Sequence, residues 1–379
     1  MDSSKSTQPK RRKVVFSSYD DVNNPFYGGG GARSIYKIVK RLSHHYNITI
    51  VTGNYSGAEN NNNKITFIRI GPKFLGPKLS QVVYHILLPF YLRKLKFDVW
   101  VESFTPPFST SFLPLFTKKP VVGLVHTLSA QEMERKYEIP FQIIENLGLK
   151  LYKTFIVLSQ NYKQLIQKRN KSAKIYIIPN GVAPEYLSHS AQGNHILFLG
   201  RLEIEQKGID LLLDAYRSIV DHTSVNLVIA GPGSLRENRF ILKYIERYNL
   251  TSRVTITGRV SGENKEKLLS DSIFLVVPSR QESFSMVALE AMANGKPVVS
   301  FSIDGLDWIK KDCVLQASPF DAEELGQCML TLIKNKKLRQ KMGVKALAFS
   351  KNYSWSSSAE KYRKVLIHSM KPQYEIRCS

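Results

Sequence analysis

Short apolar runs alternate with amphipathic stretches along almost the whole chain. Some runs, of which IFLVV at 273–277 is one, are apolar at every position, which is typical of parallel strands covered on both faces. Helical spacing lies between the runs, as where Ile209, Leu212, Leu213 and Tyr216 recur at i, i+3, i+4 and i+7. This alternation predicts two doubly wound α/β domains. We expect their strands at 13–19, 47–52, 64–70, 98–102, 120–126, 154–159, 174–178, 195–200, 225–230, 254–257, 273–278 and 297–301.

A polar stretch, SHSAQGN at 188–194, is the best candidate for a linker between the two domains. A chain of 379 residues is long enough for two domains of ordinary size. We therefore predict an N-terminal domain at 1–187, a C-terminal domain at 188–355 and a terminal segment at 356–379.

The composition excludes several classes of protein. Three widely spaced cysteines, Cys313, Cys328 and Cys378, indicate neither a disulfide scaffold nor a zinc finger and are typical of a reducing cytoplasm. The longest apolar run, 82–92, is too short to span a bilayer, and no signal-peptide pattern follows the polar start. We expect a cytoplasmic protein that is neither secreted nor integral to a membrane.

Charge is the outlying property, because the formal net charge is +23. Residues 1–190 hold 27 basic and 11 acidic residues, whereas residues 191–379 hold 27 and 20. The excess therefore lies mostly in the first half. It favours a partner that is a polyanion or an anionic surface, such as nucleic acid, phospholipid head groups or a phosphorylated substrate.

The segment from Lys73 to Lys96 contains five basic residues and no acidic one. Its apolar residues follow helical spacing, and we expect Pro89 to kink or end the regular helix. Two interpretations stand side by side: a helix whose apolar face packs on the core, and a segment that lies on an anionic membrane surface. The apolar positions are Leu79, Val82, Val83, Ile86, Leu87 and Phe90.

Two cations follow the first strand of the second half. Gly200 ends this strand and Arg201 comes next, while Lys207 and Gly208 open the following helix. Ligands of α/β sheets bind outside the carboxyl ends of the strands, so Arg201 and Lys207 are candidates for clamping a diphosphate. The alternative is a pair of surface cations on a turn.

A loop and helix after the strand at 273–278 carry two carboxylates. The free N–H groups of Phe284 and Ser285 at the helix N-terminus form a candidate anion site. Glu282 lies before the helix and Glu290 within it, about 12 Å along the axis, so the two suit different parts of one elongated ligand. Alternatively, Glu282 caps the helix and Glu290 forms an ordinary surface pair.

A run of glycines, 28–31, precedes a helical pattern in the first half. It does not complete the G-x-G-x-x-G fingerprint of dinucleotide binding, because position 33 is Arg33 and no acidic residue ends the next strand. Gly29 and Gly30 still permit an anion or sugar phosphate to approach the backbone at a helix N-terminus. The alternative for this run is a flexible turn. His126, which ends the strand VVGLVH, is a further candidate site residue, and its alternative is a structural histidine.

Together these motifs resemble the nucleotide-binding half of family-4 retaining glycosyltransferases, which have the GT-B fold of two Rossmann-like domains facing a central cleft. The resemblance covers nearly the whole chain and is strongest over 195–301. It is carried by Gly200-Arg201, Lys207-Gly208, Gly231-Pro232-Gly233, Gly258 and ESFSMVALEAMANGKPVV at 282–299. One departure follows residue 301, where the family usually has paired glycines and Pro-Glu; here SIDGLDW stands at 302–308, with Asp307 as the candidate replacement for the glutamate.

The resemblance implies a role for each matching residue. Arg201 and Lys207 would hold the donor diphosphate beside Gly200, and Glu282 would contact the transferred sugar. Glu290 would bind the ribose hydroxyls, and the backbone around Val260 would read the base. The glycine loop and His126 would touch the donor, so the implied catalytic set is His126, Arg201, Lys207 and Glu282.

The implied activity is transfer of a hexose, with retention, from a nucleotide-diphosphate sugar to a glycan or lipid-linked acceptor, as in cell-envelope glycan or glycolipid synthesis. The resemblance also implies that the helix around 356–370 returns to the first domain. We expect no metal, because no Asp-x-Asp occurs, and no cofactor beyond the co-substrate. The alternatives are a sugar-nucleotide epimerase on the same fold and a basic nucleic-acid-binding protein, although no nucleic-acid-binding module is recognisable. The residues indicate no oligomeric state.

Overall fold

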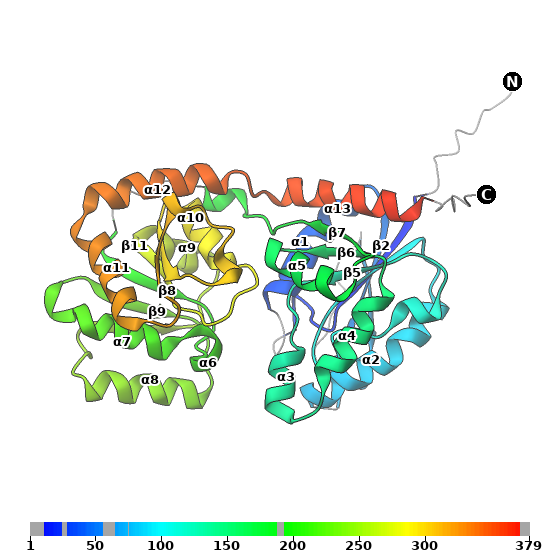
Figure 1. Cartoon of the computed structure of the whole chain (residues 1–379), viewed down its shortest axis with the longest axis horizontal. Coiled ribbons are helices and arrows are strands. Elements are labelled where there is room, and N and C mark those ends of the chain that lie inside the picture. Colours follow the sequence, from blue (N-terminus) through cyan, green and yellow to red (C-terminus); the bar gives the residue numbers. More distant parts are fainter. Residues whose placement is uncertain (1–10, 25–28, 56–64, 75, 188–192, 372–379) are drawn as a thin grey trace, which may run out of the picture. The chain divides into compact units, whose positions relative to one another are not determined.

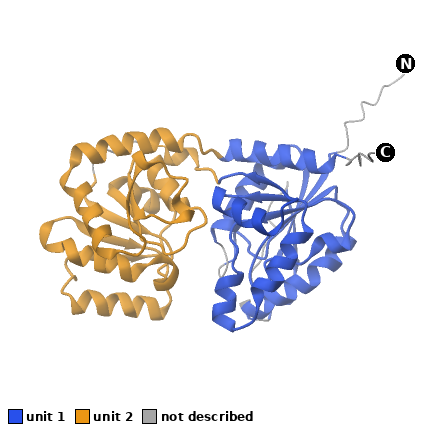
Figure 2. Ribbon diagram, in the orientation of Figure 1, with its two compact units in different colours: residues 1–179, 355–379 blue, residues 180–354 orange. Residues whose placement is uncertain are grey.

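The computed structural model describes residues 11–24, 29–55, 65–74, 76–187 and 193–371. The chain forms two compact units (Figure 2): unit 1 is residues 1–179 with 355–379, and unit 2 is residues 180–354. The first boundary therefore falls at Pro179 rather than at 187, and residues 188–192 of the expected linker lie outside the described residues.

Unit 1 is built on a seven-stranded parallel sheet in the order β3-β2-β1-β4-β5-β6-β7 (Figure 1). The chain order reverses between β1 and β4, which pair directly, as in a doubly wound sheet. Its strands are β1 (Lys13–Ser17), β2 (Asn47–Gly53), β3 (Ile65–Ile70), β4 (Val99–Ser103), β5 (Val121–Val125), β6 (Thr154–Val157) and β7 (Lys174–Ile177).

Helices flank this sheet and bury apolar side chains against it. Trp100 of β4 is fully buried, and its indole Nε1 donates to Ser17 Oγ at 2.8 Å, so the ring lies inside without leaving its N–H unpaired. The helices of unit 1 are α1 (Gly30–Leu42), α2 (Pro77–Lys94), η1 (Leu113–Phe116), α3 (Ala130–Tyr137), α4 (Phe141–Leu151), α5 (Gln160–Arg169) and α13 (Trp355–Met370).

Unit 2 repeats the plan with a six-stranded parallel sheet in the order β10-β9-β8-β11-β12-β13. The strands are β8 (His195–Leu199), β9 (Asn226–Ala230), β10 (Val254–Gly258), β11 (Ser272–Val277), β12 (Val298–Phe301) and β13 (Val314–Ala317). The helices are η2 (Pro184–Tyr186), α6 (Ile204–Lys207), α7 (Ile209–Ile219), η3 (Val220–His222), α8 (Leu235–Arg247), α9 (Gly262–Asp271), α10 (Met286–Ala293), η4 (Asp304–Leu306), η5 (Lys311–Cys313), α11 (Ala322–Lys334) and α12 (Lys336–Ser350).

The two doubly wound sheets confirm the predicted fold class. All twelve expected strands are present, with ends that differ from the prediction by no more than two residues. The prediction omitted β13, whose four residues, VLQA, form a run too short to signal a strand. This strand pairs in parallel with β12 at the edge of the sheet.

Helix α2 differs from the prediction in two respects. It continues through Pro89 to Lys94, so the proline does not end it. The side chains that pack on the core are Tyr84, Leu88 and Leu92, whereas Leu79, Ile86 and Phe90 of the expected apolar face are exposed. The core-packing interpretation is therefore wrong for those three residues, because this helix is apolar on more than one side.

Gly231 adopts a backbone conformation that only glycine accepts easily, with φ +149°, and a Cβ there would lie 1.6 Å from the carbonyl oxygen of Gly200. Gly231→Ala is expected to lower the free energy of unfolding by at least about 2 kcal/mol. Gly258 is the matched control: its φ is +68°, but nothing lies within 4 Å of an added Cβ. Its alanine variant should lose only about 1 kcal/mol in the same denaturant titration. Equal losses of unfolding free energy in the two alanine variants would show that the approach of Gly231 to the Gly200 carbonyl oxygen leaves room for a Cβ.

Candidate functional site

The strand order of unit 2 brings two loops together where β8 and β11 end, at the point where a doubly wound sheet binds ligands. Gly208 separates α6 from α7 with φ +65°, and a Cβ there would lie 2.1 Å from the carbonyl oxygen of Pro278. Only a glycine at this position lets the loop after β8 contact the loop after β11 so closely.

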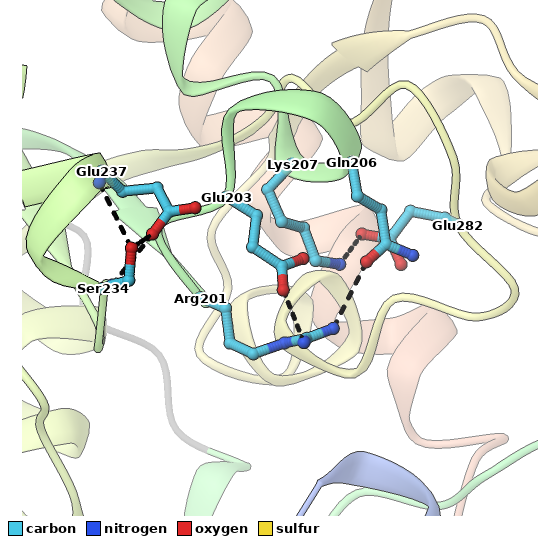
Figure 3. A network of polar contacts seen from close by, with 7 residues as sticks. All are labelled: Arg201, Glu203, Gln206, Lys207, Ser234, Glu237 and Glu282. Atoms are coloured by element: carbon cyan, nitrogen blue, oxygen red, sulfur yellow. Dashed lines mark hydrogen bonds and ion pairs between the residues drawn. The ribbon is translucent and has the colours of Figure 1, made fainter. Parts of the chain in front are cut away.

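The structure brings Arg201, Lys207 and Glu282 to this place (Figure 3). Lys207 Nζ lies 2.7 Å from Glu282 Oε1, which also accepts from Ser279 Oγ at 2.9 Å. Arg201 donates to Glu203 Oε1 at 2.6 Å and to Gln206 Oε1 at 3.3 Å. Its side chain remains 62% exposed, so the guanidinium is free to reach an anion in solvent.

Arg280 joins the two loops and was not predicted from the sequence. Its guanidinium forms a two-pronged pair with Asp210, at 2.9 and 2.6 Å, and donates to the carbonyl oxygen of Ile204 at 2.8 Å. Its N–H donates to the carbonyl oxygen of Gln206 at 2.9 Å. The hydrogen bond to Asp210 raises the pKa of Arg280, so this link stays charged. No spacing in the sequence signals a pairing between residues so far apart.

The N-terminus of α10 lies directly after Glu282. Ser285 caps this helix by accepting from Ala288 N–H, so the alternative in which Glu282 is the cap is wrong. The Phe284 ring is buried and stacks on Trp308 with ring centroids 4.3 Å apart, which leaves the backbone at 284 and 285, rather than their side chains, to meet a ligand. Gly305 packs on Glu282, since a Cβ at 305 would lie 1.8 Å from the Glu282 carbonyl oxygen.

Glu290 has a separate partner. Lys265 Nζ of α9 lies 2.7 Å from Glu290 Oε2 and 5.3 Å from the ring centroid of Tyr186. Glu290 is buried, so it does not form the ordinary surface pair of the alternative interpretation. No pattern in the chain pointed to Lys265. Val260 is half-buried in the turn between β10 and α9, and Asp307 is exposed, its pKa raised by partial burial and by Asp304.

Figure 3 includes a further feature beside this site, at the start of α8. Ser234 caps the helix by accepting from Glu237 N–H, while the Glu237 side chain accepts from Ser234 N–H, which is a capping box. The cap directly follows the Gly231–Gly233 turn. It fixes the direction in which the chain leaves β9.

In unit 1 the structure brings the glycine run and His126 together. Gly29 is the N-cap of α1, Gly30 has open space beside it, and an added Cβ on Gly31 would lie 3.5 Å from His126 Nδ1. Gly28 lies outside the described residues. Burial lowers the pKa of His126 to about 4, so the imidazole is neutral at neutral pH, and its Nε2 finds no hydrogen-bond partner among the described residues. A neutral ring with an unpartnered nitrogen offers a hydrogen bond to a bound molecule.

Glu102 of β4 lies in a buried network that the sequence did not indicate. Its carboxylate accepts from Ser111 N–H at 2.6 Å, from Thr110 Oγ1 at 3.2 Å and from the Tyr152 hydroxyl. Burial raises the pKa of Glu102 to about 7. The hydrogen bonds reduce this effect without cancelling it, because desolvation is the larger contribution.

Within the part of the chain that the structure describes, no three His, Cys, Asp or Glu side chains are placed to hold a metal ion, and no helix is long and apolar enough to cross a bilayer. The predicted residues thus form a cationic group with Glu282, a separate Glu290 site and, in unit 1, the pairing of the glycine run with His126.

Solved structures share this architecture. The sucrose-phosphate synthase from Thermosynechococcus elongatus has a TM-score of 0.82 at 19% identity, over 94% of this chain and 99% of that one. HepE of Anabaena, solved in complex with UDP and glucose, has a TM-score of 0.74 at 18% identity, over 94% and 99% of the two chains. The chain therefore has the GT-B fold.

The sequence comparisons agree. Residues 28–186 match the family described as Glycosyltransferase Family 4, and residues 184–348 match Glycosyl transferases group 1. The phosphatidyl-myo-inositol mannosyltransferase of Mycobacterium leprae is 28% identical over 199 residues, which are 50% of this chain and 52% of that protein. The chain spans about half the length of the curated relatives it matches. The chain belongs to the family-4, group 1 glycosyltransferases.

The Glu102 network predicts a pH dependence of stability. Because the folded pKa of about 7 exceeds the ordinary value of 4.5, the folded state binds this proton more tightly, and the stabilisation is lost as pH rises through about 7. His85 and His126, with pKa values lowered to about 4, act in the opposite direction at lower pH.

We therefore expect the free energy of unfolding of Glu102→Gln, relative to the unmodified protein, to rise between pH about 5 and about 8. The difference isolates the contribution of Glu102, because both proteins keep the two histidines. Glu132→Gln, which removes an exposed carboxylate of α3, is the control. Parallel curves for Glu102→Gln and the unmodified protein would contradict the buried, proton-binding role.

Proposed function

We propose that this protein transfers a hexose from a nucleotide-diphosphate sugar to a glycan or lipid-linked acceptor, with retention of configuration. The observation that carries the proposal is the group formed by Arg201, Lys207 and Glu282 at the carboxyl ends of β8 and β11. Two cations and a carboxylate beside a helix N-terminus match a diphosphate joined to a hydroxyl-rich sugar. The HepE structure, solved with UDP and glucose, supports the same kind of donor.

The donor would bind by exchanging partners. Lys207 is already paired with Glu282, so a diphosphate that takes the ammonium releases a carboxylate oxygen for a sugar hydroxyl. Arg201 is exposed and provides the second, two-pronged contact. Both cations then face the oxygen on which negative charge grows as the glycosidic bond breaks, which lowers the barrier to an oxocarbenium-like state.

Retention would follow from reaction on the face that the leaving phosphate occupies. That phosphate accepts the proton of the acceptor hydroxyl, so no side-chain nucleophile is required. We assign the glycine loop at Gly29 and Gly30 and the neutral His126 to hydrogen bonds with the bound sugar. Because Arg201 and Lys207 supply the positive charge, the proposal needs no metal ion, and activity should persist in a chelator.

The nucleoside would lie near Glu290 and Val260. Glu290 would accept hydrogen bonds from the ribose hydroxyls, while Lys265 holds the buried carboxylate in place. The acceptor class draws support from the mannosyltransferase relative, whose name specifies a phosphatidylinositol acceptor. The thiols Cys313 and Cys328 are free, in keeping with our proposal of a cytoplasmic enzyme.

The direct test is a thermal-shift screen of nucleotide sugars, followed by transfer of radiolabelled sugar to a lipid extract and to glycan acceptors, with the anomeric configuration of the product read by NMR. An epimerase would alter the donor sugar without any acceptor. Binding of no nucleotide sugar, together with salt-sensitive binding to DNA, would overturn the proposal in favour of a nucleic-acid-binding protein.

Glu290→Gln should weaken the binding of the preferred nucleotide by about 1–3 kcal/mol, because charged hydrogen bonds to the ribose are lost. Calorimetry measures this, and the loss should be smaller for the 2′-deoxy analogue. Glu263→Gln, which removes an exposed carboxylate of α9, should leave affinity unchanged. Unchanged affinity in a folded Glu290→Gln variant would remove Glu290 from the donor site.

Arg201→Ala and Lys207→Ala should each reduce kcat by about 100-fold or more at saturating donor, because both act on leaving-group charge. Arg239→Ala and Lys267→Ala remove exposed cations elsewhere in unit 2 and should keep normal turnover. Circular dichroism checks that all four variants fold. Near-normal turnover in both site variants would place the diphosphate elsewhere.

A further inference from the structure

Unit 1 exposes an unusual number of large apolar side chains in one region. On α2, Leu79, Ile86 and Phe90 are 53%, 59% and 59% exposed. Side chains of the same kind are exposed on η1 and on the α3–α4 segment. We call this set the apolar face, and it consists of Leu79, Ile86, Phe90, Leu115, Phe116, Tyr137, Ile139, Ile143 and Leu147.

Two contacts between a cation and an aromatic ring link the elements of the apolar face. Lys78 Nζ of α2 lies 5.6 Å from the ring centroid of Tyr137, and Arg93 Cζ lies 5.5 Å from that of Phe116. The N-terminal part of α2 thus lies near the C-terminus of α3, and the C-terminal part of α2 lies near η1. Large apolar side chains that are exposed together on linked elements are typical of an interaction site.

Helices α2 and α4 share one support. The segment 105–112 contacts both helices: His85 of α2 packs on Phe108 with ring centroids 5.7 Å apart, and Ser109 donates to Glu145 of α4 at 2.6 Å. Because both helices rest on this segment, their outward sides belong to one surface.

The charges beside the apolar face are all positive along α2 and η1 and mixed along the α3–α4 segment, where residues 130–151 hold three basic and four acidic residues. Residues 73–97 and 113–119, which contain α2 and η1, hold seven basic residues and no acidic one. All seven side chains are exposed: Lys73, Lys78, Arg93, Lys94, Lys96, Lys118 and Lys119. Lys78 and Arg93 lie over aromatic rings at the margin, which keeps their charged ends beside the apolar side chains.

We propose that the apolar face docks on the surface of an anionic phospholipid bilayer. Apolar side chains would enter the head-group boundary while the surrounding cations contact lipid phosphates. A second copy of this chain is the competing occupant, but a two-fold contact of α2 with α2 would bring cations against cations. The docking is independent of the transfer reaction; the corollary, that the acceptor is a lipid of this membrane, rests on the proposed function.

Vesicle co-sedimentation of the full chain tests the proposal without any donor. We expect binding to vesicles of phosphatidylcholine with phosphatidylglycerol and little binding to vesicles of phosphatidylcholine alone. Binding should weaken as the salt concentration rises, because a shorter Debye length screens the attraction between the cations and the lipid phosphates. The charge variant replaces Lys73, Lys78, Arg93, Lys94 and Lys96 with Gln. The apolar variant replaces Leu79, Ile86 and Phe90 with Ser.

Each cation removed should lower vesicle partitioning about fivefold, so the charge variant, which removes five, should lose about 3,000-fold. The apolar variant should lose about tenfold or more. Matched controls come from unit 2: five exposed lysines changed to Gln, and three exposed apolar residues changed to Ser, should bind as the unmodified protein does. These are Lys334, Lys336, Lys337, Lys341 and Lys351, and Leu235, Leu242 and Val344.

A direct readout places the surface. Vesicles with brominated lipid should quench the fluorescence of the tryptophan introduced by Phe90→Trp. They should not quench the fluorescence of the tryptophan introduced by Leu242→Trp. Equal losses in the control variants would show that the binding depends on overall charge rather than on the apolar face. Either that result or the absence of vesicle binding would overturn the proposal. So would a concentration-dependent dimer that the apolar variant abolishes, because the face would then belong to a second copy. If vesicle binding holds but no transfer to any acceptor occurs, the proposed function fails and the docking stands.

Discussion

The candidate donor site depends on one close contact between two loops. Gly208 passes within reach of the Pro278 carbonyl oxygen, and the Arg280 N–H bonds to the Gln206 carbonyl oxygen just beside it. Through these contacts Lys207 and Glu282, far apart in the sequence, come within 2.7 Å. Any side chain at position 208 would separate the loops and disperse the charges. A tight backbone approach, rather than the charges themselves, therefore builds the site.

Two lysines of the candidate site are paired with carboxylates. Lys207 is paired with Glu282 and Lys265 with Glu290. Both pairs are largely withdrawn from solvent, where an unpaired charge is costly. If these carboxylates serve the sugar and the ribose as proposed, the donor exchanges partners with the Lys207–Glu282 pair, while Lys265 continues to hold Glu290. Under that proposal, the two pairs hold the carboxylates in place before the donor binds.

The sequence predicted the two sheets well because buried parallel strands are apolar throughout and stand out from their surroundings. It missed β13 because VLQA is short and contains a glutamine. It could not orient α2, since Tyr84, Leu88 and Leu92 form an apolar stripe as good as the one left exposed. Local periodicity cannot decide between two apolar stripes; only the packing partner does.

The same limit applies at the site. Arg201, Lys207 and Glu282 could be proposed from the sequence because they lie close to glycines or strand ends that have a recognisable order, whereas the ribose role of Glu290 rested on the family resemblance. The fold alone brings together two other pairs, Arg280 with Asp210 and Lys265 with Glu290. No spacing in the sequence predicts these pairs. The residues that position the candidate site are therefore harder to predict from the sequence than the residues proposed to bind.

The return of α13 to unit 1 has a consequence for synthesis of the chain. Unit 2 is one continuous stretch, 180–354, inserted before the helix that completes unit 1. Helix α13 buries Trp355, Tyr362 and Leu366 and packs on α1. On the ribosome, unit 2 is synthesised before α13 emerges. The side of α1 that packs on α13 therefore has no partner helix while the whole of unit 2 is made. The part of the protein that is translated first is the last to reach its final packing.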